Sequence, residues 1–312
     1  MEETKNQISL GLVTYNQCEL LKIFIQNYMQ FGQKILPLFI VDDGSEDETR
    51  LFLSSLKTES NITIHTTSHE SIAHARNLIL KIVTTPWLAF SDTDCVLNQD
   101  YFRLIQNIPT QYADAVGIEG AIHYAHSYKP PFTHSLRNEQ GSMYATANMI
   151  FHVPSVLKLG GFDLQYKNFR EDVDLALRIT SQGAPIPFAQ NLIVYHPHVP
   201  RKLLPSLKSA WKKQSNIIGS EILLYQKHPI HYKFVRYHSN ANKTIWNWFI
   251  KYLILNLIAE INCIQLKKIF LQRNILKSIQ ISFAIIITNL WEQICIIILC
   301  LLKINTLLGL TK

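Results

Sequence analysis

The sequence predicts an α/β fold, with a mostly parallel sheet flanked by helices over residues 1–200 and a helical region over residues 201–312. In the first part, short apolar segments alternate with segments of helical periodicity, the pattern of parallel sheets built from right-handed βαβ units. Polar or acidic residues directly follow several of these apolar segments. After residue 200 the composition becomes strongly basic and apolar, and this change places the expected domain boundary.

Four strands are expected within the first hundred residues. They cover residues 8–16, where a short strand runs into a polar turn, and residues 36–41, 62–65 and 86–91, and a helix is expected over residues 71–78. Ligands of open α/β sheets bind where the strands end, so the polar residues that follow these strands should converge at one edge. Those residues are Tyr15, Asp42, Asp43, Asp92 and Asp94.

Asp92 and Asp94 follow an uncharged strand that contains Trp87 and Phe90. Two carboxylates one residue apart can bind the same hard cation, and Mg2+ or Mn2+ held in this way commonly bridges a nucleoside diphosphate. Asp is also common in solvent-exposed turns, and this is the alternative explanation of the pair. The acidic and polar ends of the other strands favour the metal-binding interpretation.

Six motifs occur along the chain in the order VTYN, VDDGSEDET, AHARN, SDTD, GGFD and EDVDLALR. Together they resemble glycosyltransferase family 2, whose members are inverting enzymes with the GT-A fold. The resemblance covers residues 1–200, about two-thirds of the chain. It implies the transfer of a sugar from a nucleotide-sugar donor to a hydroxyl acceptor.

The resemblance assigns the nucleotide to the ends of the first two strands. Tyr15 would stack on the base, and Asp42 or Asp43 would accept a hydrogen bond from the base or the ribose. Ser45 and Asp47 are explained without a ligand, as caps of the helix that begins near residue 48. Adjacent acids at a strand end repel each other unless something binds them, so we favour a binding role for Asp42 and Asp43.

Arg76 lies on the expected helix with Ala75 and Ile79 on a plausible apolar face. By the resemblance it would contact the base or the diphosphate. A solvated charge is the commoner fate of a helical arginine. The position of Arg76 shortly before the strand that ends at Asp92 favours the diphosphate contact.

Asp172 would be the general base of the family reaction. It lies in the first turn of a helix expected around residues 169–179, where the helix macrodipole by itself favours acids and explains Glu171 and Asp174. Inversion at the anomeric carbon still needs one carboxylate to take the proton of the acceptor hydroxyl. No second catalytic acid is needed, because the metal ion stabilises the leaving diphosphate.

By the same resemblance, Asp94 would hold the metal ion with help from Asp92. Some members of the family also use a late histidine on the metal ion or on a phosphate. His196 and His198 follow another expected strand, and His196 is the better candidate ligand. The alternative is a proline-containing surface loop with incidental histidines, since no acidic partner that would orient the imidazole is visible in the sequence.

The overall charge of +7 conceals two different parts. Residues 1–200 hold 14 Lys and Arg against 20 Asp and Glu, a net charge of −6, and residues 201–312 hold 16 against 3, a net charge of +13. The second part also contains two nearly apolar stretches, residues 245–258 and 281–302, with four basic residues between them. This pattern is typical of helices on an anionic membrane surface, here the cytoplasmic face of the cell membrane. Such apolar stretches and the absence of nucleic-acid motifs argue against a nucleic-acid partner.

Residues 281–302 are long enough to cross a hydrocarbon core of about 30 Å. Asn289, Glu292 and Gln293 fall in the middle of this stretch, and a central acid is costly in lipid. Surface attachment is therefore favoured over a true span. Cytoplasmic exposure also agrees with the cysteines, which show neither metal-binding spacing nor an even disulfide framework, and with a polar start that does not resemble a signal peptide.

The sequence therefore predicts an inverting, hexosyltransferase-like enzyme that acts in cell-surface polysaccharide or lipid-linked glycan assembly. Residues 124–142 are expected to form a loop near the acceptor. A nucleotidyltransferase acting on sugar phosphates is one alternative, but it needs a glycine-rich basic loop that residues 12–17 do not provide. A non-catalytic membrane-associated scaffold is the other, and the intact Asp94 and Asp172 argue against it.

Overall fold

The computed structural model describes residues 7–125, 133–134, 136–166, 168–197, 199–200 and 207–231. These residues belong to two compact units, one up to residue 200 and one that contains residues 207–231. The expected tail stretches, residues 245–258 and 281–302, lie outside the described residues. The domain boundary near residue 200 therefore stays an expectation.

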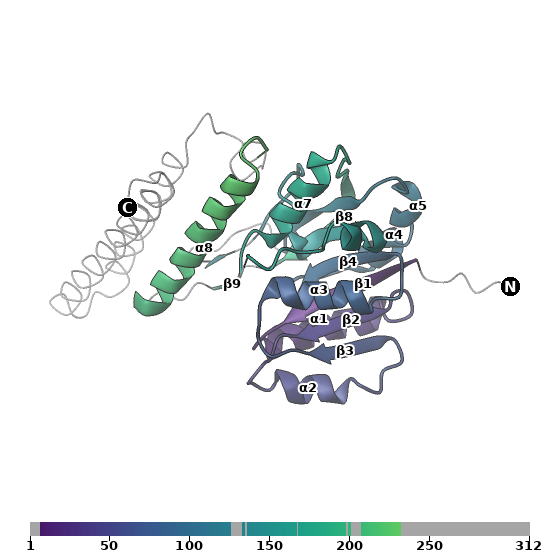
Figure 1. Cartoon of the computed structure of the whole chain (residues 1–312). Helices are drawn as coiled ribbons and strands as arrows, with labels where there is room; N and C mark the ends of the chain where they lie inside the picture. The colour runs from purple at the N-terminus through teal and green to yellow at the C-terminus, as the bar shows by residue number, and fades with distance from the viewer. Residues whose placement is uncertain are drawn as a thin grey trace, which may run out of the picture. The chain divides into compact units, whose positions relative to one another are not determined.

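The first unit is built on a seven-stranded sheet with the order β3-β2-β1-β4-β7-β5-β8 (Figure 1). Its strands are β1 Ile8–Thr14, β2 Leu38–Asp42, β3 Ile62–Thr66, β4 Trp87–Asp92, β5 Gly117–Tyr124, β7 Met149–His152 and β8 Phe188–His196. Strand β7 is antiparallel to β4 and β5, and every other pairing in this sheet is parallel. The mostly parallel α/β sheet predicted from the sequence is confirmed. A separate short pair joins β6 Thr133–His134 to β9 Val199–Pro200.

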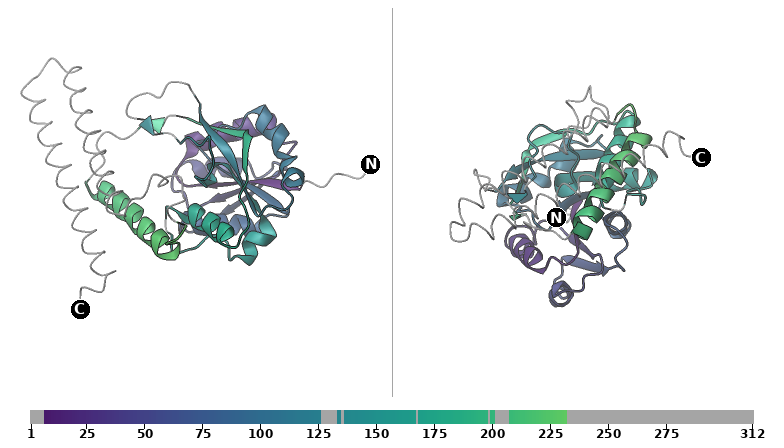
Figure 2. Two further views of the ribbon diagram at one scale, coloured as in Figure 1. Left: turned by 90° about the horizontal axis from the view of Figure 1, so that it is seen from above. Right: turned by 90° about the vertical axis from the view of Figure 1, so that its left-hand side faces the viewer.

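Helices cover both faces of the sheet (Figures 1 and 2). One face packs against α1 Cys18–Phe31, α2 Thr49–Ser55, α4 Gln99–Ile105 and α5 Ile108–Gln111. The other packs against α3 Ile72–Ile82, α6 Val153–Lys158 and α7 Glu171–Ser181. The sheet is therefore the middle of three layers.

Alternation along the central strands creates the two cores. In β4, Trp87 and Ala89 pack into one core, while Leu88 and Phe90 pack into the other. Successive side chains of a strand point to opposite faces, so a strand that is apolar throughout must be covered on both sides. A fully buried leucine or phenylalanine contributes about 1.5–3 kcal/mol relative to an exposed one, so this double burial fixes the register of the sheet.

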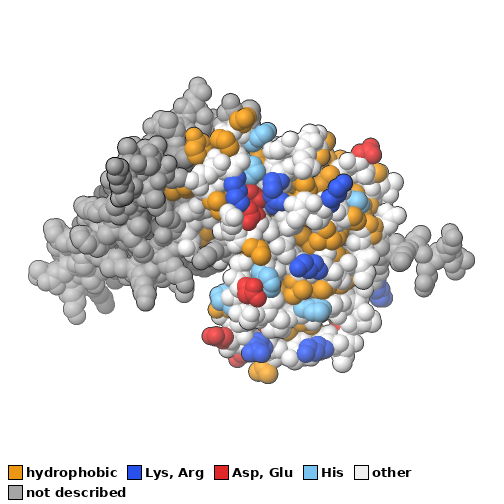
Figure 3. Space-filling view, viewed as in Figure 1, with side chains coloured by type: hydrophobic (Ala, Val, Ile, Leu, Met, Phe, Trp, Pro, Cys, Tyr) orange, Lys and Arg blue, Asp and Glu red, His pale blue; other side chains and the backbone are white. Residues whose placement is uncertain are grey.

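The face of the described residues that Figure 3 shows carries mixed charge. On the face shown in Figure 3, basic, acidic and histidine side chains are interspersed with apolar ones rather than gathered by sign. The second unit contributes helix α8, Leu207–Lys227. Among the described helices, none is both long and apolar enough to cross a bilayer.

Candidate active site

The carboxyl ends of β1, β2 and β4 lie side by side at one edge of the sheet. Thr14 at the end of β1 pairs in register with Asp42, and Val13 pairs with Asp92. Strand β8 runs in the same direction and ends at His196. The tertiary structure therefore brings the predicted residues from four strands to the same edge, as expected for a parallel sheet.

Asp94 and His196 form a pair at this edge. Val96 and Tyr195 exchange two backbone hydrogen bonds of 2.8 and 3.0 Å, which join the segment after β4 to the end of β8. As a result, Asp94 Oδ2 lies 3.3 Å from His196 Nε2, and the imidazole is almost fully buried.

The tautomer of His196 follows from its other ring nitrogen. Nδ1 lies 2.9 Å from the carbonyl oxygen of Pro197, and because a carbonyl oxygen only accepts, Nδ1 carries a hydrogen. In the neutral ring, Nε2 then has its lone pair available beside the Asp94 carboxylate. Two acceptor atoms at this distance need a proton or a cation between them, and an imidazole oriented by a backbone carbonyl is a common arrangement at metal sites. These residues fit a divalent ion, and the orienting partner that the sequence did not reveal is the Pro197 carbonyl.

Asp92 lies beside Arg76 rather than in the Asp94–His196 pair. Asp92 Oδ1 is 3.6 Å from Arg76 Nη2, and the other terminal nitrogen of Arg76 donates a short hydrogen bond to Glu171 Oε1. Partial burial raises the pKa of Asp92 most strongly, Arg76 opposes this, and the charges of Asp94 and Asp172 add to the increase. Asp92 is thus in electrostatic contact with Asp94 and Asp172, the predicted metal ligand and the predicted base.

Arg76 is only 4% exposed, so the solvated-charge alternative is wrong. Its guanidinium bridges Asp92 and Glu171 and lies 5.8 Å from the centre of the Phe162 ring. Glu171 is 3% exposed, and burial, followed by the charge of Asp172, raises its pKa. The helix-dipole explanation of Glu171 missed this ion pair, which links α3 to α7. The signal in the sequence was an arginine on an apolar helix face with no nearby acid.

The proposed nucleotide end of the site contains Tyr15 and a histidine that the sequence reasoning missed. The Tyr15 ring stacks on His69 with ring centres 3.9 Å apart and an angle of 14°. His69 has a left-handed backbone (φ 60°), and its Nδ1 lies 3.1 Å from the backbone oxygen and 3.2 Å from Oδ2 of Asp43. Gly44 permits this approach, because a Cβ there would lie 2.9 Å from the His69 nitrogen.

Asp42 and Asp43 shape two different turns. Asp42 Oδ1 accepts hydrogen bonds from the backbone nitrogen (3.0 Å) and hydroxyl (2.5 Å) of Ser45. Asp43 Oδ1 accepts from the Thr67 hydroxyl (2.7 Å) and the Glu70 nitrogen (3.2 Å). Among the described residues, the buried Oδ2 of Asp42 has no hydrogen-bond partner. A buried oxygen without a donor is costly, and this orphaned atom agrees with a binding role for Asp42.

Asp172 occupies the first turn of α7, as predicted. Its Oδ1 accepts from the Val173 backbone nitrogen at 2.8 Å, and its Oδ2 accepts from the Thr146 backbone nitrogen at 3.3 Å. Arg170, just before the helix, has a left-handed backbone (φ 73°), which turns the chain sharply into α7. Two backbone donors therefore hold the carboxylate in one orientation at the start of the helix.

Comparison with known proteins gives a family match over part of the chain. Residues 9–153 match the family described as Glycosyl transferase family 2. The chain contains a family 2 glycosyltransferase domain. A search of curated proteins finds no significant match.

Solved structures with the same fold are distant in sequence. Mannosyltransferase PcManGT from Pyrobaculum calidifontis, solved with GDP-Man and Mn2+, is 15% identical, with a TM-score of 0.55 over 92% of this chain and 87% of its own. S. aureus TarS 1-349 is 13% identical, with a TM-score of 0.52 over 81% of this chain and 80% of its own. GalNAc-T7, solved with UDP, GalNAc and Mn2+, is 12% identical, with a TM-score of 0.53 over 76% of this chain and 57% of its own. These likenesses show a GT-A-like fold.

The GGFD motif, which follows the residues matched by the family, is held from two sides. The Asn77 side chain exchanges two hydrogen bonds (2.7 and 2.8 Å) with the backbone of Phe162, and Arg178 donates to the Gly161 oxygen (2.6 Å). Gly161 has a φ of 70°, and a Cβ there would lie 2.4 Å from Asn77 Oδ1. Asp174 in turn accepts from Arg178 at 2.8 Å. Asp174 is therefore a structural acid that anchors the GGFD turn through Arg178.

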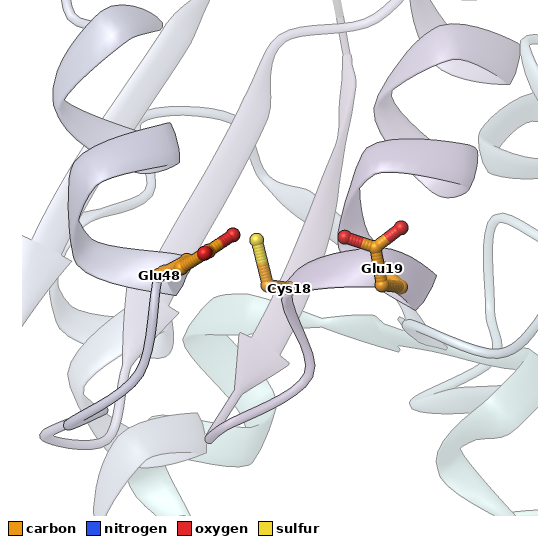
Figure 4. A group of neighbouring side chains, drawn as sticks. All are labelled: Cys18, Glu19 and Glu48. Carbon is orange, nitrogen blue, oxygen red and sulfur yellow. The ribbon is translucent and has the colours of Figure 1, made fainter.

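One further acidic cluster in the glycosyltransferase domain does not resemble its active site. Among the described residues, Cys18, Glu19 and Glu48 are the one group of three or more His, Cys, Asp or Glu side chains whose ligand atoms all lie within 4.8 Å of one another (Figure 4). The Lys22 ammonium lies 2.8 Å from Glu19 and 4.0 Å from Glu48. Lys22 offsets part of the charge of these two acids, and because exposed acids of this kind are common without a bound ion, this cluster by itself does not indicate a metal site.

The buried ion pair of Arg76 leads to a stability prediction. In Arg76→Ala, Glu171 should remain buried without a partner, so the free energy of unfolding should fall by about 3–5 kcal/mol. Without the guanidinium the pKa of Glu171 should rise further above its ordinary value of 4.5. A carboxyl group whose pKa is higher in the folded chain than in the unfolded chain destabilises the folded state once the pH rises above its pKa in the unfolded chain. The loss of unfolding free energy in Arg76→Ala should therefore be larger at pH 8 than at pH 5.

Urea unfolding of the two proteins at both pH values measures this effect. Arg103→Ala is the matched control, because Arg103 pairs with Asp100 on the surface, where both side chains are about 70% exposed, and its loss should change little. Adding Glu171→Gln to Arg76→Ala should restore part of the stability. Equal stability of Arg76→Ala and the wild type would contradict the ion-pair account.

Proposed function

We propose that the chain transfers a sugar from a nucleoside diphosphate sugar to a hydroxyl acceptor, with inversion and with Mg2+ or Mn2+. The observation that carries this proposal is the pairing of Asp94 with His196 at the sheet edge that also holds Asp92, while Asp172, in the first turn of α7, is in electrostatic contact with Asp92. This arrangement supports a metal ion and a general base acting at the same site. The Mn2+ in the structures of PcManGT and GalNAc-T7 supports metal use by this fold.

The residues divide between the donor and the acceptor. Asp94 and His196, with Asp92, would hold the metal ion, which when bound neutralises the charge of the diphosphate leaving group. The nucleobase would stack on the exposed part of the Tyr15–His69 pair, and Asp42 would offer its unpaired oxygen. These contacts orient the donor so that its anomeric carbon faces the acceptor.

Asp172 would take the proton of the acceptor hydroxyl as that oxygen attacks. The hydrogen bonds from Val173 and Thr146 hold the carboxylate without supplying it with a proton, because both nitrogens are backbone amides. Proton transfer to a positioned base contributes typically 10²- to 10⁴-fold to the rate. A single accessible base on the acceptor side is the requirement of an inverting mechanism.

A retaining reaction would need a carboxylate that attacks the sugar directly. Glu171, the acid next to Asp172 in the chain, is buried and bonded to Arg76, so it is not available as a nucleophile. This arrangement supports inversion over retention.

Purified full-length protein tests the proposal directly. A panel of UDP- and GDP-sugars should be assayed for binding and for slow hydrolysis, with and without Mn2+. We expect at least one nucleotide sugar to bind and to be hydrolysed only when Mn2+ is present. Metal-independent binding of every compound, or binding of none, would contradict the proposal.

The basic C-terminal part leads us to propose that the enzyme works at the cytoplasmic face of the membrane, on a lipid-linked or membrane-held acceptor. Support comes from the composition of residues 201–312, with a net charge of +13 and two apolar stretches. Basic residues near an anionic surface contribute about 1 kcal/mol each, and salt screens this attraction.

Neutralising Lys267, Lys268, Arg273 and Lys277 should therefore weaken binding to anionic liposomes, most strongly at low ionic strength. The control removes the same charge from the exposed Arg50, Lys57, Lys81 and Lys158 of the glycosyltransferase domain, and it should bind liposomes like the wild type. Co-sedimentation with liposomes measures both variants. If the full-length protein resists extraction by high salt and by alkaline carbonate, the attachment is a bilayer span.

A further inference from the structure

Glu119 is a buried acid of β5 to which the reaction described above assigns no role. It is 1% exposed, and its carboxylate is saturated with donors from one later segment. Oε1 accepts from the Asn138 side chain (2.7 Å) and from the backbone nitrogens of Met143 (2.9 Å) and Tyr144 (2.6 Å). Oε2 accepts from the Ser142 nitrogen (2.6 Å). The Glu119 carboxylate therefore accepts hydrogen bonds from three backbone N–H groups of this segment, in the place of backbone oxygens.

The segment needs such support because its backbone is unusual. Gly141, Ser142 and Tyr144 have φ values of 76°, 64° and 59°. Residues other than glycine disfavour this left-handed region, and several of them close together persist only where surrounding groups hold them. Three consecutive amides directed at one buried carboxylate provide that hold.

The far end of the segment is fixed to the same strand. Asn148 is buried, and its side-chain nitrogen donates to the backbone oxygens of Ala121 and Leu192, both at 2.8 Å. Gly120 lies between Glu119 and Ala121, and a Cβ there would be 2.2 Å from the Asn148 side chain. Residues 141–148 are thus attached to β5 at both ends.

Between these two attachments lies Thr146, whose backbone nitrogen donates to Asp172 Oδ2 at 3.3 Å. The direction of this N–H depends on the path of the chain from Ser142 to Asn148. We propose that Glu119 is a positioning residue for catalysis, which acts through residues 142–146 to direct the Thr146 N–H at Asp172 and so to orient the general base. This inference rests on the proposed role of Asp172.

The variant that tests it is Glu119→Gln in the full-length protein. A glutamine has one acceptor oxygen and places an NH2 donor against amide donors, so it cannot bind all four partners. Hydrolysis of the nucleotide sugar that the wild type hydrolyses fastest, with water as acceptor, should fall by about 10- to 100-fold, the usual effect of a misplaced catalytic group. Binding of UDP or GDP with Mn2+, measured by calorimetry, should stay within about twofold, since the donor contacts are elsewhere.

Tyr28→Phe is the control for a general loss of stability. It also removes a buried hydrogen bond, from the Tyr28 hydroxyl to the Leu36 oxygen (2.6 Å), but it does so before β2, at the opposite edge of the sheet. This variant should hydrolyse the nucleotide sugar at the wild-type rate. A similar loss of activity in both variants would mean that Glu119 is only structural.

Two measurements separate positioning from other roles. If Glu119 acts through Asp172, then Glu119→Gln should cause little further loss of hydrolysis in an Asp172→Asn background, whereas independent effects would multiply. Hydrogen exchange of the Thr146 amide should be at least about tenfold faster in Glu119→Gln than in the wild type and unchanged in Tyr28→Phe. Multiplying effects, or an unchanged Thr146 amide, would overturn the proposal.

The exchange measurement also distinguishes this inference from the proposed function. If the wild type hydrolyses no nucleotide sugar, or if Asp172→Asn retains full activity, the proposed reaction or its base is wrong. In that case, faster amide exchange confined to residues 142–146 in Glu119→Gln would still support the conclusion that Glu119 holds this segment. The proposed link between Glu119 and the general base would be rejected.

Discussion

Asp172→Asn should reduce turnover by roughly two to four orders of magnitude, the usual contribution of general-base catalysis. The amide oxygen can still accept the 2.8 Å hydrogen bond from Val173, so the start of α7 should keep its structure. An amide cannot take a proton from the acceptor hydroxyl at neutral pH. Affinity for the nucleotide with Mn2+ should therefore change by no more than about twofold, because only the transition state loses an interaction.

Single-turnover rates and calorimetry on the same preparation measure the two quantities. Asp114→Asn, the same chemical change at an exposed position, should behave like the wild type. Loss of nucleotide binding together with activity would place Asp172 in the metal or nucleotide site instead.

Asp94→Asn should abolish the Mn2+-dependent part of nucleotide binding. The substitution removes the carboxylate that lies 3.3 Å from His196 Nε2 and replaces it with a neutral ligand that hard divalent cations bind weakly. The nucleobase contacts at Tyr15 would remain, so weak metal-independent binding should persist. Activity should be lost together with the metal, because the leaving diphosphate would lose the cation proposed to neutralise it.

Titrations of UDP and GDP with and without Mn2+ measure this loss, and thermal unfolding checks that the variant still folds cooperatively. Asp100→Asn is the matched control, since Asp100 lies six residues further along the chain, is largely exposed and pairs only with Arg103 among the described residues. Equal nucleotide affinity of Asp94→Asn and the wild type in the presence of Mn2+ would exclude Asp94 as the principal metal ligand.

The strands, the helices and the edge where they meet could be predicted from local patterns. Apolar segments of strand length alternate with helical periodicity, and a parallel sheet carries the residues after each strand to one edge whatever the rest of the chain does. For this reason the ends of β1, β2 and β4 deliver Thr14, Asp42 and Asp92 side by side, in the register of the sheet. The position of Asp172 in the first turn of α7 follows from local sequence in the same way.

Only the tertiary structure decided which partners these residues have. Arg76 is a buried bridge rather than a solvated charge because α7 brings Glu171 to it from 95 positions away. His196 faces Asp94 because a bridge between Val96 and Tyr195 joins two distant segments. Periodicity, capping residues and strand ends are local properties that a sequence displays directly. A buried ion pair depends on how separate elements pack, and a charged residue has the same local pattern whether its partner is water or a distant side chain.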